Sequence, residues 1–343
     1  MRVAVYYNNN DVRIEERPKP KIGPGELLVK VMASGICGSD VMEWYRIKKA
    51  PLVLGHEISG IIEEVGKGAD KYKTGDRVFV SHHIPCNTCR YCLSGHHTVC
   101  ETLHTTNYDP GGFAEFIRVP VLNVDRGVFL LPKEISFEEG AFIEPLACVI
   151  RGQRISRFLP GQSVLIMGGG ISGLLHLLAA KASGAGKIFV TDINDFRLKM
   201  AKKLGADTII NAKENVLEKI KEANDKRLAD QVVVCTGALS AFNQSLSLVD
   251  KGGNVLFFAP TDPGANLSIS INEFWRNEIT LKTSYGNSPY DAEVAIELIR
   301  TKRVLVEGMI THRLKLDKAK LGFELVAKAG ESMKVIIEPN GQD

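Results

Sequence analysis

The chain has 343 residues, a length that suggests two domains and a core large enough to hold a cleft between them. Its 43 basic and 40 acidic residues leave a formal charge of only +3, so neither a nucleic acid nor a membrane surface is an expected partner. Seven cysteines, an odd number with four crowded between residues 86 and 100, favour a metal site over a disulfide scaffold. With no apolar leader and no apolar run of about 18 residues, we expect a cytoplasmic protein.

The amino-terminal part of the chain has the pattern of a β-rich domain. Apolar runs of strand length are separated by glycine, proline and asparagine; they are VAVYY, ELLVKVMA, EISGIIEEVG, DRVFV and FAEFIRV. We therefore expect a β-rich domain over residues 1–147.

After Pro160, apolar segments alternate with amphipathic segments of helix length. SVLIMG and KIFVTD predict strands, and a helix from about Ile171 to Ser183 lies between them. One face of that helix would carry Ile171, Leu174, Leu175, Leu178, Ala179 and Ala182. Further alternation predicts a doubly wound parallel sheet over residues 148–289, and hence an α/β protein. The tail, 290–343, holds one amphipathic helix (AEVAIELIRTKRV) and a strand (KVIIEP).

A glycine-rich turn stands between the first strand and the first helix of this sheet. Gly168, Gly170 and Gly173 fit the pattern G-x-G-x-x-G, and Ile171 and Ser172 open the helix. Gly168 would permit the tight turn, Gly170 the approach of a pyrophosphate, and Gly173 close packing of helix against strand. The turn in this context predicts a dinucleotide site at the positive end of the helix.

Asp192 ends the second strand, about twenty residues beyond the last glycine. There its carboxylate can bind a ribose 2′-hydroxyl and repel a 2′-phosphate, so we expect NAD rather than NADP. Asp192 could instead only cap the next helix. Arg197, five residues on, could pair with a phosphate or face solvent.

Four cysteines in one loop predict a structural metal site. Cys86, Cys89, Cys92 and Cys100 are spaced C-x-x-C-x-x-C-x(7)-C, and four thiolates can close tetrahedrally on one Zn²⁺. An iron–sulfur cluster is the alternative, because the spacing also resembles a ferredoxin run.

A second set of candidate ligands is dispersed along the chain. It consists of Cys37 in GICGSD, His56 and Glu57 in LGHEISG, and Glu144 in FIEPLA. Each residue alone is ordinary, but beside a dinucleotide motif they favour a catalytic Zn²⁺ that polarises a substrate oxygen. The expected content is therefore two zinc ions per chain together with NAD.

The order of these motifs resembles the zinc-dependent medium-chain dehydrogenases over essentially the whole chain. The shared segments are GICGSD, LGHEISGIIEEVG, GDRV, the four-cysteine loop, GGFAEF, IEPLA, and GGGISG followed by Asp192. With the triplet Glu144-Pro145-Leu146, the chain resembles the sorbitol (L-iditol) and threonine dehydrogenase branch of this family more than the simple alcohol dehydrogenases. The resemblance implies a GroES-like catalytic domain that is interrupted by a Rossmann domain and rejoined by the tail.

The resemblance also implies individual roles. Cys37 and His56 become zinc ligands, while Glu57 and Glu144 share the remaining coordination positions, with the direct ligand left open. Asp40 would orient the zinc-bound imidazole, and Ser39 would hydrogen-bond the substrate alcohol and begin the exit of its proton.

Two residues depart from the family pattern. Met42 stands where a histidine commonly relays the proton, so the proton would leave through Glu57 or Glu144 with water, or through a cofactor hydroxyl. Arg151 stands where polyol-type relatives often carry histidine, and it is either structural or favours an anionic substrate.

The implied reaction is reversible oxidation of a secondary alcohol to a ketone, on a polyol, a sugar or a similar polar compound. A threonine- or diol-type dehydrogenase and a non-catalytic protein that binds NAD and zinc are the alternatives. The resemblance implies a homo-oligomer, a tetramer or a dimer, with NVLFFA and ITLKTSYG as interface candidates. Trp44 and Trp275 are candidates to line the cleft, and Cys148 and Cys235 are expected in the core.

Overall fold

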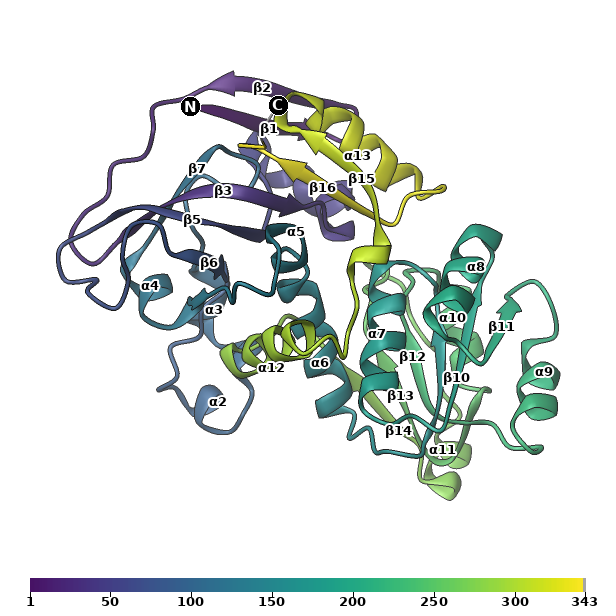
Figure 1. Cartoon of the computed structure of the whole chain (residues 1–343). Coiled ribbons are helices and arrows are strands. Elements are labelled where there is room, and N and C mark those ends of the chain that lie inside the picture. Colours follow the sequence, from purple (N-terminus) through teal and green to yellow (C-terminus); the bar gives the residue numbers. More distant parts are fainter. Residues whose placement is uncertain (342–343) are drawn as a thin grey trace. The chain divides into compact units, whose positions relative to one another are not determined.

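The computed structural model describes residues 1–341, so the last two residues of the predicted 290–343 segment lie outside it. The chain forms two compact units (Figure 1). Unit 1 comprises residues 1–147 and the chain from Asn287 onward, and unit 2 comprises residues 148–286.

Unit 1 is built on two sheets. Its strands are β1 (Arg2–Asn8), β2 (Asp11–Glu16), β3 (Leu27–Gly35), β4 (Leu52–Val53), β5 (Glu57–Val65), β6 (Arg77–Val80), β7 (Phe116–Val119), β8 (Val128–Leu130), β15 (Ile310–Lys315) and β16 (Lys334–Glu338). The small sheet has the order β2-β1-β4, and the large one β15-β16-β3-β5-β6-β8 with β7 also paired to β3. In the large sheet, Gly35 at the end of β3 lies opposite Glu57 of β5 on one side and Ile336 of β16 on the other.

Short helices connect these strands. They are α1 (Glu43–Arg46), α2 (Arg90–Leu93), α3 (Glu101–Thr105), α4 (Val121–Gly127), α5 (Phe137–Gly140), α12 (Pro289–Arg300) and α13 (Ala319–Lys328), with 3-10 turns η1 (Gly38–Val41), η2 (Ile47–Lys49), η3 (His97–Val99), η4 (Glu307–Met309) and η5 (Leu316–Lys318). A longer helix, α6 (Ile143–Ile155), runs across the division between the units. Helix α6 was not predicted from the sequence. Its Pro145 lies in the first turn, where proline is tolerated because the N–H groups there have no helical partner.

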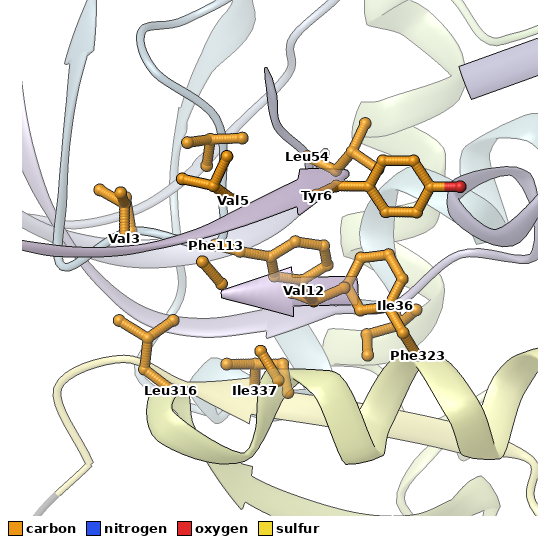
Figure 2. Packing of buried hydrophobic residues seen from close by; sticks show 14 of the residues in the cluster. Val3, Val5, Tyr6, Val12, Ile36, Leu54, Phe113, Leu316, Phe323 and Ile337 are labelled. Atoms are coloured by element: carbon orange, nitrogen blue, oxygen red, sulfur yellow. The ribbon is translucent and has the colours of Figure 1, made fainter. Parts of the chain in front are cut away.

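The carboxy-terminal helix completes the core that the amino-terminal strands begin. Phe323 of α13 lies 5.6 Å from the ring of Tyr6 in β1 and 5.5 Å from the ring of Phe113, measured between centroids. Figure 2 shows these rings packed together with Leu316 and Ile337. Because all five side chains are fully or almost fully buried, the two distant parts of the sequence fold as one unit.

Unit 2 is a parallel sheet with helices between its strands. The strands are β9 (Ser163–Met167), β10 (Lys187–Asp192), β11 (Thr208–Asn211), β12 (Ala229–Val234), β13 (Val249–Phe257) and β14 (Thr280–Thr283). The helices are α7 (Ile171–Ala182), α8 (Asp195–Leu204), α9 (Val216–Ala223), α10 (Leu239–Ser245) and α11 (Ile271–Asn277). The strand order is β11-β10-β9-β12-β13-β14. Successive strands are added on one side of β9 and then, from β12 onward, on its other side, as in dinucleotide-binding sheets. The predicted doubly wound α/β fold is confirmed.

The helix α7 differs from the prediction in how it is buried. All residues from Gly173 to Ala180 are buried, including His176, whereas Ala182, predicted on the apolar face, is exposed. A helix that is apolar around most of its circumference belongs in a core, so the expectation of one apolar face was too narrow.

No helix within residues 1–341 combines the length and apolarity needed to cross a lipid bilayer.

Candidate functional site

The four cysteines of the loop converge on one point. One sulfur from each of Cys86, Cys89, Cys92 and Cys100 lies within 4.8 Å of the others. Hydrogen bonds from Thr88 and from the backbone N–H of Cys89 lower the pKa of Cys86 to about 5, which favours the thiolate. Four converging sulfurs that include a stabilised thiolate fit a tetrahedral Zn²⁺ with no open position.

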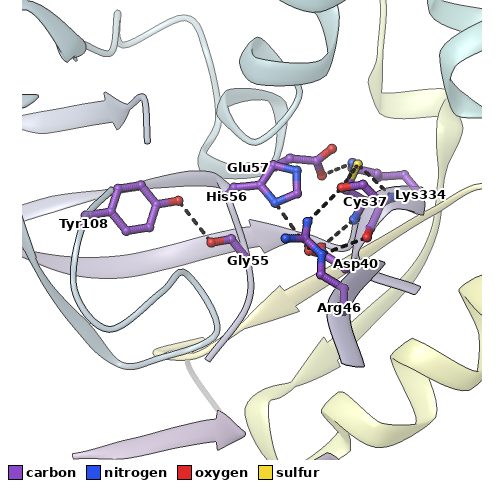
Figure 3. Close-up of polar contacts among 9 residues, drawn as sticks. Cys37, Asp40, Arg46, Gly55, His56, Glu57, Tyr108 and Lys334 are labelled. Carbon is purple, nitrogen blue, oxygen red and sulfur yellow. Dashed lines mark hydrogen bonds and ion pairs between the residues drawn. The ribbon is translucent and has the colours of Figure 1, made fainter. Parts of the chain in front are cut away.

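A second group forms where β3 ends and β5 begins. Cys37 follows β3 and caps η1, while His56 and Glu57 stand at the start of β5. Because β3 and β5 pair with Gly35 opposite Glu57, these three side chains meet, and their ligand atoms lie within 4.8 Å of one another (Figure 3). A thiolate, an imidazole and a carboxylate form the donor set of a zinc site that keeps a position open.

Asp40 contacts the His56 imidazole at its Nδ1 atom. It is fully buried; its Oδ1 lies 3.4 Å from His56 Nδ1, and its Oδ2 accepts the Cys37 N–H at 3.1 Å. Burial alone would lower the pKa of His56, but the charges of Asp40 and Cys37 raise it well above its usual value. With Nδ1 turned to Asp40, Nε2 is the ring nitrogen left for a metal.

Lys334, which was not predicted from the sequence, contacts the same site from β16. Its ammonium forms an ion pair with the Glu57 carboxylate, and both side chains are only 1% exposed. A Cβ on Gly35 would overlap both groups, so glycine at this position makes room for the pair. The available sequence signal was one lysine directly before the apolar run Val335–Ile337.

Arg46 is the second residue that was missed. From the end of α1, its Nε donates to the Ser39 carbonyl at 2.9 Å and its Nη2 donates to Ser39 Oγ at 3.1 Å. The same Nη2 lies 3.4 Å from Asp40 Oδ1. Nothing in the sequence pattern singled out this arginine.

Glu144 lies near this group but outside the converging set. Its carboxylate accepts a hydrogen bond from Asn287 at 3.3 Å, and within residues 1–341 the metal-binding group includes Glu57 but not Glu144. Burial raises the pKa of Tyr108 well above its usual value, and the charges of Glu144, Asp40 and Glu57 raise it further. The charges of all three carboxylates therefore act on one buried tyrosine.

The glycine-rich turn of unit 2 has the geometry that its three positions require. Gly168 has φ +105°, and a Cβ on Gly173 would overlap the Gly168 carbonyl. A Cβ on Gly170 would find only the tip of Arg197, 3.9 Å away, so open space remains where a phosphate would approach. Ile171 and Ser172 form the first turn of α7.

Asp192 closes this turn. Its Oδ2 accepts the Gly169 N–H at 2.7 Å, its Oδ1 accepts the Asn194 N–H at 2.8 Å, and Arg197 Nη1 lies 3.7 Å from Oδ2. The side chain that caps α8 is Asn194, which accepts the Phe196 N–H, so Asp192 is not the helix cap. The open turn with a carboxylate beside it fits the ribose and pyrophosphate of a dinucleotide.

Comparison with known proteins identifies the family. Residues 23–130 match the alcohol dehydrogenase GroES-like domain, and residues 172–301 match the zinc-binding dehydrogenase domain. Sorbitol dehydrogenase of Bacillus subtilis (strain 168) is 34% identical, and the alignment covers 99% of this chain and 98% of that protein. The chain belongs to the zinc-binding dehydrogenase family. It is therefore an oxidoreductase.

Two further relatives of this dehydrogenase are similar over nearly their whole lengths. L-threonine 3-dehydrogenase of Rhizobium etli (strain CIAT 652) is 34% identical, with 95% of this chain and 94% of that protein covered. The structure of alcohol dehydrogenase TADH from Thermus sp. ATN1 has a TM-score of 0.88 at 30% identity, with 98% and 99% covered. The predicted GroES-like and Rossmann architecture is thereby confirmed.

Several other predicted features of the dehydrogenase can now be placed. Trp275 is 76% exposed on α11, and Trp44 is 38% exposed on α1, where its ring contacts Tyr45. Cys148 and Cys235 were expected in the core, but both are only partly buried. Burial nevertheless raises the pKa of the Cys235 thiol. Arg151 is buried in α6, which supports its structural interpretation.

Proposed function

We propose that this dehydrogenase reversibly oxidises a secondary alcohol of a polyol, sugar or similar polar compound to the ketone, with NAD as the hydride acceptor. The convergence of Cys37, His56 and Glu57 within 4.8 Å carries the proposal. That donor set suits a substrate oxygen, and the glycine-rich turn of unit 2 suits the cofactor. The similarity to a sorbitol dehydrogenase supports a hydroxyl-rich substrate.

In this proposal each residue of the site has a separate task. Zinc held by Cys37, His56 and Glu57 would supply a Lewis acid that polarises the substrate oxygen. Asp40 fixes the orientation of His56, and the Ser39 hydroxyl, 3.4 Å from Cys37 Sγ, binds the substrate hydroxyl.

Glu144 is proposed as the second carboxylate of this site. Its charge acts on Tyr108 together with the charges of Asp40 and Glu57, which supports that role. With water, Glu144 offers the released proton a route that bypasses the thioether of Met42.

The four-cysteine loop would hold a second, structural zinc, so the proposed content is two ions per chain. Measurement by plasma mass spectrometry should give about two zinc per chain; a content near one would favour the non-catalytic alternative. Iron together with visible absorption would instead favour a cluster.

NAD is proposed over NADP because the Asp192 carboxylate is held at the turn by two backbone N–H groups. The ratio of kcat/KM for NAD to kcat/KM for NADP should be greater than one. Asp192→Asn keeps an acceptor oxygen but removes the charge, and should narrow that ratio. A wild-type enzyme that prefers NADP would contradict the assignment, and would point to Arg197 as the group that binds the 2′-phosphate.

The domain roles follow from the same proposal. Residues 1–147 and 290–343 would form the catalytic domain, and residues 148–289 would bind NAD. We also propose a homo-oligomer, a dimer or tetramer, because β14 is an edge strand of its sheet and could pair with a second copy. Light scattering after size exclusion tests this, and a monomer would refute it. Thiolates kept as metal ligands suit a reducing compartment such as the cytoplasm.

The decisive experiment is NAD reduction by the zinc-loaded protein with sorbitol, xylitol, 2,3-butanediol and L-threonine. Turnover of a polyol supports the proposal, and absence of turnover with every alcohol refutes it. Turnover of L-threonine alone would favour the second candidate, which the equal similarity to an L-threonine 3-dehydrogenase supports. Cys37→Ser should abolish turnover and leave NADH binding unchanged, whereas retained activity would remove Cys37 from the ligand set.

A further inference from the structure

Arg46 connects two residues of the candidate site that are adjacent in sequence. Its guanidinium donates to both Ser39 oxygens, at 2.9 and 3.1 Å, and lies 3.4 Å from Asp40 Oδ1. The side chain is 15% exposed and covers the ring of Tyr45, with 4.8 Å between the guanidinium carbon and the ring centroid. Arg46 is therefore held at several points and has little freedom to move.

The chemistry of these contacts fixes the direction of one hydrogen bond. A guanidinium only donates hydrogen bonds and stays protonated at any relevant pH. Its contact with Ser39 Oγ therefore occupies a lone pair of that oxygen, and the Ser39 O–H must point elsewhere. In the structure it donates to Cys37 Sγ at 3.4 Å.

The same contact closes one route for a proton. A proton that reached Ser39 could not continue through Arg46, which has no basic atom, or through the thioether of Met42, three residues along the chain. The positive charge of Arg46 beside Ser39 Oγ also makes it unfavourable for this oxygen to accept a proton, and favours a hydroxyl that acts as a hydrogen-bond donor.

We infer that Arg46 is a positioning residue: it holds the Ser39 hydroxyl as a hydrogen-bond donor to the reacting oxygen of the substrate. The inference rests on the proposed function, and it changes the role expected for Ser39. Ser39 binds and orients the oxygen in both alcohol and ketone, and the proton of the alcohol leaves by a route that does not pass through Arg46.

The test is a double-mutant cycle between Arg46→Met and Ser39→Ala in the zinc-loaded enzyme. Arg46→Met alone should lower kcat/KM by about 10- to 100-fold, as loss of a group that orients a ligand does elsewhere. In the Ser39→Ala background the same change should cost no more than about 3-fold, because the hydroxyl it positions is absent. Arg46→Lys keeps the charge but not the planar guanidinium that donates two hydrogen bonds to Ser39, so its kcat/KM should lie between those of Arg46→Met and the wild type.

A binding measurement gives a second readout that does not need turnover. Dimethyl sulfoxide has an oxygen that only accepts hydrogen bonds, so a donor hydroxyl should bind it in the complex with NADH. Calorimetry should show about 10-fold weaker binding in Arg46→Met, with no further loss in the double variant. Zinc content and the dissociation constant for NADH should match the wild type.

Lys48→Met is the matched control, because Lys48 carries the same charge in the same segment but is exposed. Its kinetics should equal those of the wild type. Equal losses in Lys48→Met and Arg46→Met, multiplicative losses in the double variant, or unchanged dimethyl sulfoxide binding would each overturn the inference. If the wild type oxidises no alcohol, the proposed function fails, while the dimethyl sulfoxide measurement still decides whether Arg46 holds the Ser39 hydroxyl as a donor.

Discussion

Replacing Lys334 with methionine should destabilise unit 1 more than any substitution of a surface lysine. Lys334 and Glu57 are each 1% exposed, so removal of the ammonium leaves a buried carboxylate without its counter-charge. Methionine keeps most of the apolar length of the side chain, and the loss therefore measures the charge rather than the packing.

The size of the effect follows from the burial of the pair. Two unit charges about 3 Å apart attract by about 5.5 kcal/mol at an effective dielectric constant of about 20. Measured losses from breaking buried pairs are about 3–5 kcal/mol, which is the range we expect. In a unit of this size, that free energy lowers the melting temperature by roughly 6 to 20 °C.

Calorimetry with zinc-free protein gives the cleanest measurement, because a bound cation would itself compensate Glu57. The double variant Glu57→Gln/Lys334→Met removes both charges and should regain most of the lost stability. Lys318→Met is the control: its partner Asp317 lies 3.7 Å away, the two side chains are 63% and 53% exposed, and the expected change is within about 1 kcal/mol. A loss below about 1 kcal/mol in Lys334→Met, or no recovery in the double variant, would refute the reasoning.

Three further predictions concern other parts of the molecule. Gly173→Ala should lower the stability of unit 2 by about 1–3 kcal/mol or more, because its Cβ overlaps a backbone carbonyl. Gly170→Ala should melt like the wild type but bind NADH more weakly in a fluorescence titration. A destabilised Gly170→Ala together with a Gly173→Ala of wild-type stability would contradict the assignment. Cys92→Ser should lose one zinc per chain by mass spectrometry and keep the second, whereas an unchanged content would exclude the four-cysteine site. Burial raises the pKa of Glu139, but the hydrogen bonds that its carboxylate accepts from Lys302 and from the Ser136 N–H outweigh this and leave the pKa lowered. The pair therefore stabilises the fold above the pKa of the unfolded chain, about 4.3. The stability difference between wild type and Glu139→Gln should shrink below that pH, and a constant difference would contradict the prediction.

The features that the sequence predicted depend on neighbours along the chain. The four cysteines lie within fifteen residues, and the glycine-rich turn is fixed by the strand and helix on either side of it. The alternation of apolar and amphipathic segments was enough to predict the parallel sheet, since its strands are short continuous apolar runs and its helices carry their own period. Local patterns of this kind do not need knowledge of tertiary contacts.

The features that the sequence did not predict depend on tertiary contacts. Lys334 reaches Glu57 only because β16 and β5 flank the same strand, and no local pattern pairs the two residues. Arg46 contacts Ser39 because η1 and α1, which follow each other directly, turn the chain back on itself, and short turns of this kind leave no periodic signal. The extent to which α7 is buried likewise depends on what covers it, which the sequence of α7 does not contain.

The pairing of Glu57 with Lys334 has a consequence for biosynthesis. The two residues are 277 positions apart, and translation proceeds at about 5–20 residues per second, so Glu57 is synthesised roughly 14 to 55 s before its partner. During that interval the nascent chain carries Cys37, His56 and Glu57 without the strand that completes their sheet. A growing chain therefore has its candidate metal ligands before it has the lysine that neutralises one of them, and the order in which metal and lysine meet the carboxylate is set by the ribosome.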